Sequence, residues 1–89
     1  MPETINTISS KVLKYFIQEN IKMGELPQEQ LKMDYIENGL LDSFAIVGLI
    51  VYLEDEFKIS FTQEDLQSKE FRTILGLSEI ILNKIKLKV

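Results

Sequence analysis

The sequence contains no cysteine and no histidine among its 89 residues. Without cysteine, neither a disulfide nor a thiolate metal site can form. Without histidine, the chain lacks the usual catalytic base near neutral pH and the commonest zinc ligand. These absences exclude much enzymatic chemistry, and we expect no metal site.

Long hydrophobic segments are also absent. The longest apolar run, residues 44–53, contains ten residues including Gly48, and a membrane-spanning helix needs about twice that length. The N-terminal segment MPETINTISS has neither the basic nor the apolar region of a signal peptide. These features predict a cytoplasmic protein without membrane insertion.

The residues that are present are typical of a folded protein. Hydrophobic residues make up 45% of the chain and charged residues 27%, which is richer in large apolar side chains than a disordered segment. A chain of this length can build one hydrophobic core but not two. We therefore expect residues 1–89 to form a single domain, and we separately expect this domain to be a monomer.

Negative charge is concentrated in the middle of the chain. Residues 34–65 carry eight acidic residues and a single basic one, Lys58, for a net charge of −7, whereas the remaining residues carry +3. Such a region repels nucleic acid and speeds encounters with basic protein surfaces. The partners are therefore expected to be proteins and not nucleic acids.

The spacing of apolar residues predicts an all-α fold with four helices of unequal length. The first covers about residues 4–20, and residues 21–41 form a long ordered loop with one turn around 28–33. The second runs from Ser43 to about Glu56, and residues 57–60 are expected to be extended. A short third helix covers about residues 62–68, and the fourth follows residue 73.

Local residues also predict the helix starts and the core. Thr62 and Asp65 match a capping box, and Thr73 is placed as an N-cap. The three tyrosines are expected at surface or boundary positions. The residues predicted to lie in the core are Phe16, Leu53, Phe57, Ile59, Leu77 and Ile81, and the loop residues predicted to pack on it are Leu26, Leu31, Met33, Ile36 and Leu40.

The segment ENGLLDSF places Ser43 at the start of the second helix. If Asp42 is the N-cap, its carboxylate accepts amide hydrogens from the first turn, and Ser43 becomes the first helical residue with its hydroxyl facing water. Taken alone, this pair is an ordinary helix start. The surrounding sequence favours a more specific interpretation.

Three segments resemble acyl carrier proteins: D-x-x-E-x-G-L-L-D-S-F at residues 34–44, L-E-D-E-F-x-I at 53–59 and F-R-T-I at 71–74. The resemblance covers most of the chain and is specific between residues 34 and 74. It implies a small four-helix bundle of the acyl-carrier type. It also implies that Ser43 receives 4′-phosphopantetheine from coenzyme A.

The resemblance implies a carrier that is not itself an enzyme and that has several enzymes as partners. The protein would hold an acyl or aminoacyl group as a thioester on the phosphopantetheine attached to Ser43 and present it to these enzymes. The partners implied are a phosphopantetheinyl transferase, an acyl- or aminoacyl-loading ligase and downstream acyl-processing enzymes of fatty acid or specialised acyl biosynthesis. Serine without an adjacent base is a poor nucleophile, so an external transferase is required.

Two positions depart from the carriers of fatty acid synthesis. Those carriers usually have leucine after the serine and a carboxylate five residues beyond it, where this sequence has Phe44 and Gly48. The form Gly-Leu-Leu-Asp-Ser at residues 39–43 is closer to the D-alanyl carrier protein and to carriers of aminoacyl and specialised pathways.

Residues next to Ser43 are candidates for binding partner enzymes. Phe44, Val47 and Val51 share one side of the second helix with Ser43, and an apolar face there either contacts partners or packs on the preceding loop. Asp42 and Glu54 add negative charge to the same region. Acids at the helix end, where the dipole disfavours them, strengthen the case for electrostatic docking.

Two other functions remain as alternatives. The protein could be a small helical adaptor for protein–protein contacts in which Ser43 is only a helix cap. A hydrolase would need a cleft that raises the pKa of one carboxyl of a pair, and the sequence gives little sign of one. Asp34, Glu37 and Asp42 also lack the ligand spacing of a calcium-binding loop.

Overall fold

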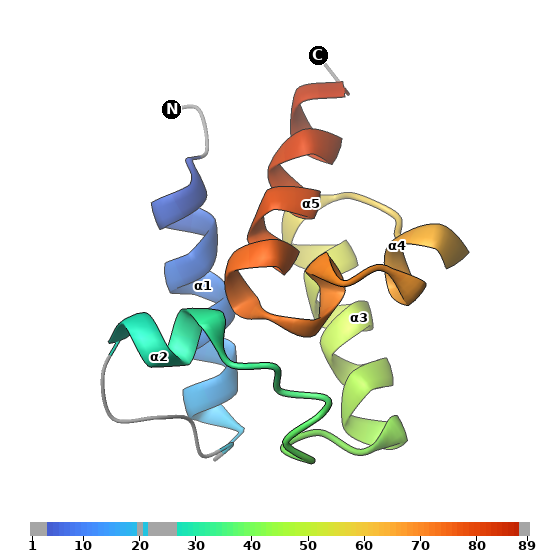
Figure 1. Cartoon of the computed structure of the whole chain (residues 1–89). Coiled ribbons are helices and arrows are strands. Elements are labelled where there is room, and N and C mark those ends of the chain that lie inside the picture. The colour runs from blue at the N-terminus through green and yellow to red at the C-terminus, as the bar shows by residue number, and fades with distance from the viewer. Residues whose placement is uncertain (1–3, 20, 22–26, 88–89) are drawn as a thin grey trace.

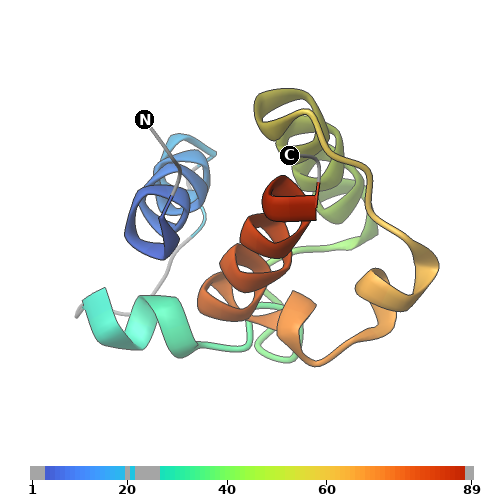
Figure 2. The same ribbon diagram turned by 90° about the horizontal axis from the view of Figure 1, so that it is seen from above.

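The computed structural model describes residues 4–19, 21 and 27–87, and the regular elements in those residues are all helices. In chain order they are α1 (Ile5–Gln18), α2 (Pro27–Lys32), α3 (Ser43–Phe57), α4 (Gln63–Gln67), the 3₁₀ helix η1 (Glu70–Arg72) and α5 (Ile74–Leu87). Figures 1 and 2 show α5 in the middle, with α1 on one side and α3 and α4 on the other. The predicted all-α bundle is confirmed, and α2 is the turn expected within the long loop.

Side-chain caps start the helices where the sequence predicts them. The Thr62 hydroxyl accepts a hydrogen bond from the Asp65 amide at 3.1 Å, and the Asp65 carboxylate accepts one from the Thr62 amide at 2.8 Å, which completes the capping box of α4. At α5 the Thr73 hydroxyl accepts from the Gly76 amide at 2.9 Å. Both predicted caps are confirmed.

The end of α3 differs from the prediction. Phe57 belongs to the helix, and Lys58 is not extended but left-handed, with φ 56° and ψ 49°. The amides of Lys58 and Ile59 both donate to the carbonyl of Glu54. This tight turn brings Ile59 back to the core beside Phe57, and both are buried, which offsets the cost of the left-handed backbone.

The six predicted core residues are all buried. Together with the other buried apolar residues of the described chain they form the core: Ile8, Val12, Phe16, Tyr35, Leu41, Leu49, Leu53, Phe57, Ile59, Phe71, Ile74, Leu77 and Ile81. Of the predicted loop contacts, Leu31, Ile36 and Leu40 pack against this core, and Met33 is partly exposed. Leu26 lies outside the described residues.

Tyr35 is the exception among the tyrosines, because the prediction of a surface or boundary position is wrong for it. Its side chain is 0% exposed, with the rings of Phe16 and Phe71 at centroid distances of 5.2 and 6.5 Å. The phenol hydroxyl donates a hydrogen bond to the carbonyl of Phe71. A tyrosine whose hydroxyl finds such a partner can be fully buried.

A second buried polar contact joins α1 to α5. The Ser9 hydroxyl donates to the Ser78 hydroxyl at 2.9 Å, and Ser78 donates to the carbonyl of Ile74 at 2.7 Å. Both hydroxyls are thereby satisfied inside the bundle. None of the helices in the described part of the chain is both long enough and apolar enough to cross a membrane.

Candidate functional site

Ser43 is exposed and is the first residue of α3. Asp42 precedes it with an extended backbone, and its carboxylate accepts a hydrogen bond from the Ala45 amide at 2.7 Å. The N-cap predicted at Asp42 is confirmed. Because Asp42 satisfies the end of the helix, the Ser43 side chain is not needed as a cap and is left at the surface.

The apolar side chains next to Ser43 form an uncovered face of α3. Phe44 is 88% exposed, Val47 59% and Val51 61%. The opposite side of the helix is buried through Leu49 and Leu53. The alternative that the exposed face packs on the preceding loop is therefore wrong, since side chains in such a contact would be covered.

The acids at the end of α3 have intramolecular contacts. The Glu54 carboxylate accepts a hydrogen bond from the Phe61 amide at 2.9 Å and so holds the connection between α3 and α4. Asp55 pairs with Lys58 at 3.7 Å, and Glu56 lies 3.8 Å from the ammonium of Lys11. Glu54 thus has a structural contact that the sequence pattern did not indicate.

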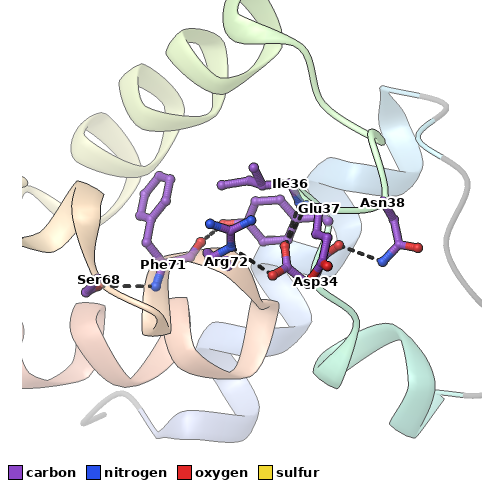
Figure 3. Close-up of polar contacts among 8 residues, drawn as sticks. Asp34, Ile36, Glu37, Asn38, Ser68, Phe71 and Arg72 are labelled. Atoms are coloured by element: carbon purple, nitrogen blue, oxygen red, sulfur yellow. Dashed lines mark hydrogen bonds and ion pairs between the residues drawn. The ribbon is translucent and has the colours of Figure 1, made fainter.

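The chain that leads to Ser43 is fastened to η1 at residues 34 and 35. One Asp34 carboxylate oxygen accepts from the amides of Ile36 and Glu37 at 3.1 and 2.7 Å. The other accepts from Arg72 Nε at 2.8 Å, as Figure 3 shows. The Tyr35 amide also donates to the carbonyl of Arg72 at 3.0 Å. These contacts join two segments that are almost forty residues apart.

The same contacts determine the charge state of Asp34. Burial by itself would raise the pKa of this carboxyl, but hydrogen bonds from the Glu37 amide, the Arg72 guanidinium and the Ile36 amide outweigh it and lower the pKa below the ordinary value. Asp34 therefore remains ionised near neutral pH and keeps its pair with Arg72.

A turn then carries the chain from Tyr35 to the start of α3. Gly39 has φ +69°, a left-handed conformation that glycine adopts without steric cost. The amides of Gly39 and Leu40 donate to the carbonyls of Ile36 and Tyr35 at 3.0 Å. Leu41 is buried, whereas Asp42 and Ser43 are exposed, so the turn delivers the serine to the surface.

A groove of about 450 Å³ lies beside this serine. The end of α1, residues 39–42 and the first turns of α3 line it, and both neighbours of Ser43 belong to that lining. Gly48, known from the sequence only as a departure from other carriers, forms part of its wall. The contributions of Tyr15 in α1 and of its C-cap residue Glu19 were not predicted, because nothing in the local pattern links them to Ser43.

Curated relatives of the chain are carrier proteins. It is 39% identical to the D-alanyl carrier protein of Leuconostoc mesenteroides subsp. mesenteroides over 54 residues, which cover 61% of this chain and 69% of the relative. It is 32% identical to the D-alanyl carrier protein of Bacillus mycoides over 57 residues, 64% of this chain and 72% of the relative. The D-alanyl carrier protein of Bacillus cereus matches to the same extent. No family model matches the chain.

The helical bundle and these similarities define the class of protein, a carrier of acyl or aminoacyl groups that is not an enzyme. The chain belongs to the carrier-protein family that includes the D-alanyl carrier proteins. The resemblance recognised at residues 34–74 is therefore confirmed at the level of the family, and the adaptor alternative is not favoured.

Proposed function

We propose that Ser43 is the residue to which a phosphopantetheinyl transferase attaches 4′-phosphopantetheine from coenzyme A. The observation that carries this proposal is the exposure of Ser43 at the first position of α3, directly after the N-cap. A modifying enzyme needs access to the hydroxyl oxygen, and a serine sealed inside the bundle would not provide it. Ser43 and its exposed position after Asp42 therefore fit the attachment of 4′-phosphopantetheine.

The contribution of the chain is to hold and position the acceptor. Asp42 fixes the start of α3 through its bond to the Ala45 amide, and Ser43 offers the hydroxyl. The helix dipole favours a phosphate at this end by about 0.3–1 kcal/mol, and the Asp42 carboxylate opposes it. When bound, the prosthetic group supplies a terminal thiol that holds an acyl group as a thioester.

The exposed apolar face beside Ser43 is the proposed contact surface for partner enzymes. Phe44, Val47 and Val51 form its centre, and Asp42 and Glu54 lie at its two ends. Large exposed apolar side chains on one helix face are typical of protein interaction surfaces. Glu54 is the weakest member, because its carboxylate already accepts a hydrogen bond from the Phe61 amide.

For the cargo, we propose D-alanine or a similarly small aminoacyl group. The support is the name of the relatives, which are D-alanyl carrier proteins, together with the Gly-Leu-Leu-Asp-Ser form at residues 39–43. The partners would then be an aminoacyl-loading ligase and the enzymes that consume the aminoacyl group. Residues 1–89 are proposed to act as a single monomeric carrier domain in the cytoplasm.

Intact-protein mass spectrometry tests the attachment. The full chain is coexpressed with a broad-specificity phosphopantetheinyl transferase, and the wild type is expected to gain one phosphopantetheinyl group. Ser43→Ala should gain none, whereas Ser60→Ala, which removes another exposed serine, should be modified like the wild type. An unmodified wild type would reject the proposal and favour the adaptor.

Transfer kinetics test the contact surface. We expect Val51→Ser to lower kcat/KM for the transferase by about tenfold, the size of effect typical of a residue in the centre of an interface. Ile17→Ser is the matched control, because Ile17 has nearly the same exposure, 60% against 61%, but lies on α1. Equal rates for the two variants would exclude Val51 from the interface.

A further inference from the structure

The groove beside Ser43 is within immediate reach of anything attached to that residue. Asp42 and Phe44, the two neighbours of Ser43, both line it. Its volume of about 450 Å³ lies in the range of small-molecule sites, roughly 300–1,000 Å³. An arm bound to Ser43 therefore starts at the edge of a hollow that is large enough for a small ligand.

Gly48 keeps this groove open. A β-carbon at residue 48 would stand 3.4 Å from the hydroxyl oxygen of Tyr15, so any side chain longer than alanine would extend into the space between α3 and α1. Tyr15 on the opposite wall is held by stacking on Tyr52, with ring centroids 4.4 Å apart and an angle of 23°. One wall of the groove therefore includes a residue without a side chain, Gly48, and the other is fixed by aromatic packing.

The described residues that line the groove carry negative charge, on Glu19 and Asp42. Among the described residues that line it, the ionisable ones are Tyr15, Glu19 and Asp42. Burial raises the pKa of Tyr15, and the nearby Glu19 carboxylate raises it further. Asp42 is engaged by the Ala45 amide, whereas Glu19 has no ion-pair partner within the described part of the chain. Such a groove attracts a cation and repels an anionic acyl group.

We infer that the groove receives the end of the prosthetic arm when the arm carries a small aminoacyl group, with the ammonium of that group at Glu19 and its side chain against Gly48. This inference rests on the attachment proposed at Ser43. It gives the small aminoacyl cargo proposed above a binding site on the carrier itself, which an anionic or long-chain acyl group would not fit. It also gives Tyr15, Glu19 and Gly48 a role in binding that is independent of the partner surface.

Two arms that differ only in charge test the inference. A broad-specificity transferase transfers the whole arm to Ser43 from either alanyl-coenzyme A or isobutyryl-coenzyme A, whose methyl group replaces the ammonium. Intact mass first establishes that one arm is present. The backbone amide resonances of Gly39, Ala45 and Gly48 are then compared by NMR between the two forms, and the lifetime of each thioester is measured against free acyl-pantetheine.

Relative to the unmodified protein, the alanyl arm is expected to shift the three amide resonances more than the isobutyryl arm does. Glu19→Gln should remove this difference and shorten the lifetime of the alanyl thioester by about two- to fivefold, as expected for a solvent-exposed ion pair. Glu79→Gln, which changes an exposed acid on α5, should leave both readouts unchanged. Gly48→Leu should abolish the difference between the two arms at the two reporters that remain, the amides of Gly39 and Ala45.

The outcomes separate this inference from the proposed attachment. Absence of any arm on Ser43 would overturn the attachment and the inference together. A modified Ser43 with identical spectra for the two arms, and no effect of Glu19→Gln, would overturn the inference alone. Because Glu19 is an exposed residue at the end of α1, this variant should fold even if Gly48→Leu does not.

Discussion

α3 and α5 begin with the same local chemistry but have opposite surroundings. Asp42 caps α3 through the Ala45 amide at 2.7 Å, and Thr73 caps α5 through the Gly76 amide at 2.9 Å. At α3 the next residue, Ser43, is exposed, whereas at α5 the next residue, Ile74, is 0% exposed. Equivalent capping bonds have thus produced one open helix start and one sealed one.

The segments packed against each helix start account for the difference. η1 packs against the first turn of α5, where the Glu70 backbone approaches Gly76. Asp34 and Tyr35 in turn bind η1 through Arg72 and Phe71. The residues before α3 leave its first turn uncovered and form a groove beside it. A cap therefore makes a helix start, but only the absence of a covering segment makes that start accessible to a modifying enzyme.

The largest effect on stability is expected at the covered start of α5. A β-carbon on Gly76 would lie 2.3 Å from the carbonyl oxygen of Glu70, so Gly76→Ala must move the η1 backbone. We expect a loss of about 3 kcal/mol in the free energy of unfolding, measured by urea denaturation. Gly48→Ala is the matched control on α3: its β-carbon makes only an ordinary contact, and it should stabilise by up to about 1 kcal/mol. Similar losses of stability in both variants would contradict the conclusion that the start of α5 is covered and that of α3 is not.

Tyr35→Phe removes the hydroxyl that ties the loop to η1. The carbonyl of Phe71 would lose its partner from the buried ring, and we expect a loss of about 2 kcal/mol. Tyr52→Phe serves as the control, because the hydroxyl of this partly exposed tyrosine makes no hydrogen bond within the described residues, and it should change stability by less than about 0.5 kcal/mol. Thermal or urea denaturation measures the loss in each variant. Equal losses would mean that the bond from Tyr35 to Phe71 does not stabilise the fold.

The pair between Asp34 and Arg72 should make the sealed start sensitive to acid. The pKa of Asp34 is lower in the folded chain than its ordinary value of 3.8, so its contribution is complete above that value and is lost as the pH falls through the lower, folded pKa. At neutral pH, Asp34→Asn should cost about 1 kcal/mol, because the pair is partly exposed.

Urea denaturation between about pH 6 and pH 3 measures this dependence. The wild type should lose stability towards the acidic end, and Asp34→Asn should lose less. Asp65, whose pKa is also lowered by its bonds to Lys84 and Thr62 in spite of burial, should retain part of the dependence in the variant. Asp55→Asn changes a carboxylate that is 86% exposed and should follow the wild type. If the stability of Asp34→Asn fell with pH as steeply as that of the wild type, Asp34 would not be the source of the acid sensitivity.

The smallest effects on stability are expected at the open start. Ser43→Ala and Phe44→Ala remove exposed side chains and should each change the free energy of unfolding by less than about 0.5 kcal/mol. Asp42→Ala should cost about 1 kcal/mol, because it removes the cap. A loss above about 2 kcal/mol in Ser43→Ala would mean that the hydroxyl, and not Asp42, caps the helix.

Much of the fold was predictable because it depends on neighbouring residues. The caps at Asp42, Thr62 and Thr73 each join residues three positions apart, and the spacing of apolar residues predicted the core face of each long helix. Tyr35 was misplaced because its hydrogen bond reaches Phe71, thirty-six positions away. Periodicity carries no information about such a partner.

The candidate site divides in the same way. Ser43, its cap and the apolar face beside it lie at the start of one helix, so local spacing was sufficient to predict their positions. The exposure of that face was left open by the sequence and came from the structure. The groove was not predictable, because Tyr15 and Glu19 of α1 meet residues 39–48 only after the bundle has formed. Gly48 could have indicated it, since a glycine inside an apolar helix often marks a close approach or an open space.

The amino-acid sequence by itself determined where the helices start, which faces are apolar and that Ser43 begins a capped helix in a chain of carrier type. These properties follow from hydrogen bonds and side-chain periodicity within one or two helical turns. The tertiary structure alone decided that the start of α3 stays open while that of α5 is covered, and that a groove borders Ser43. Exposure depends on which distant segments pack together, and packing is a property of the whole bundle.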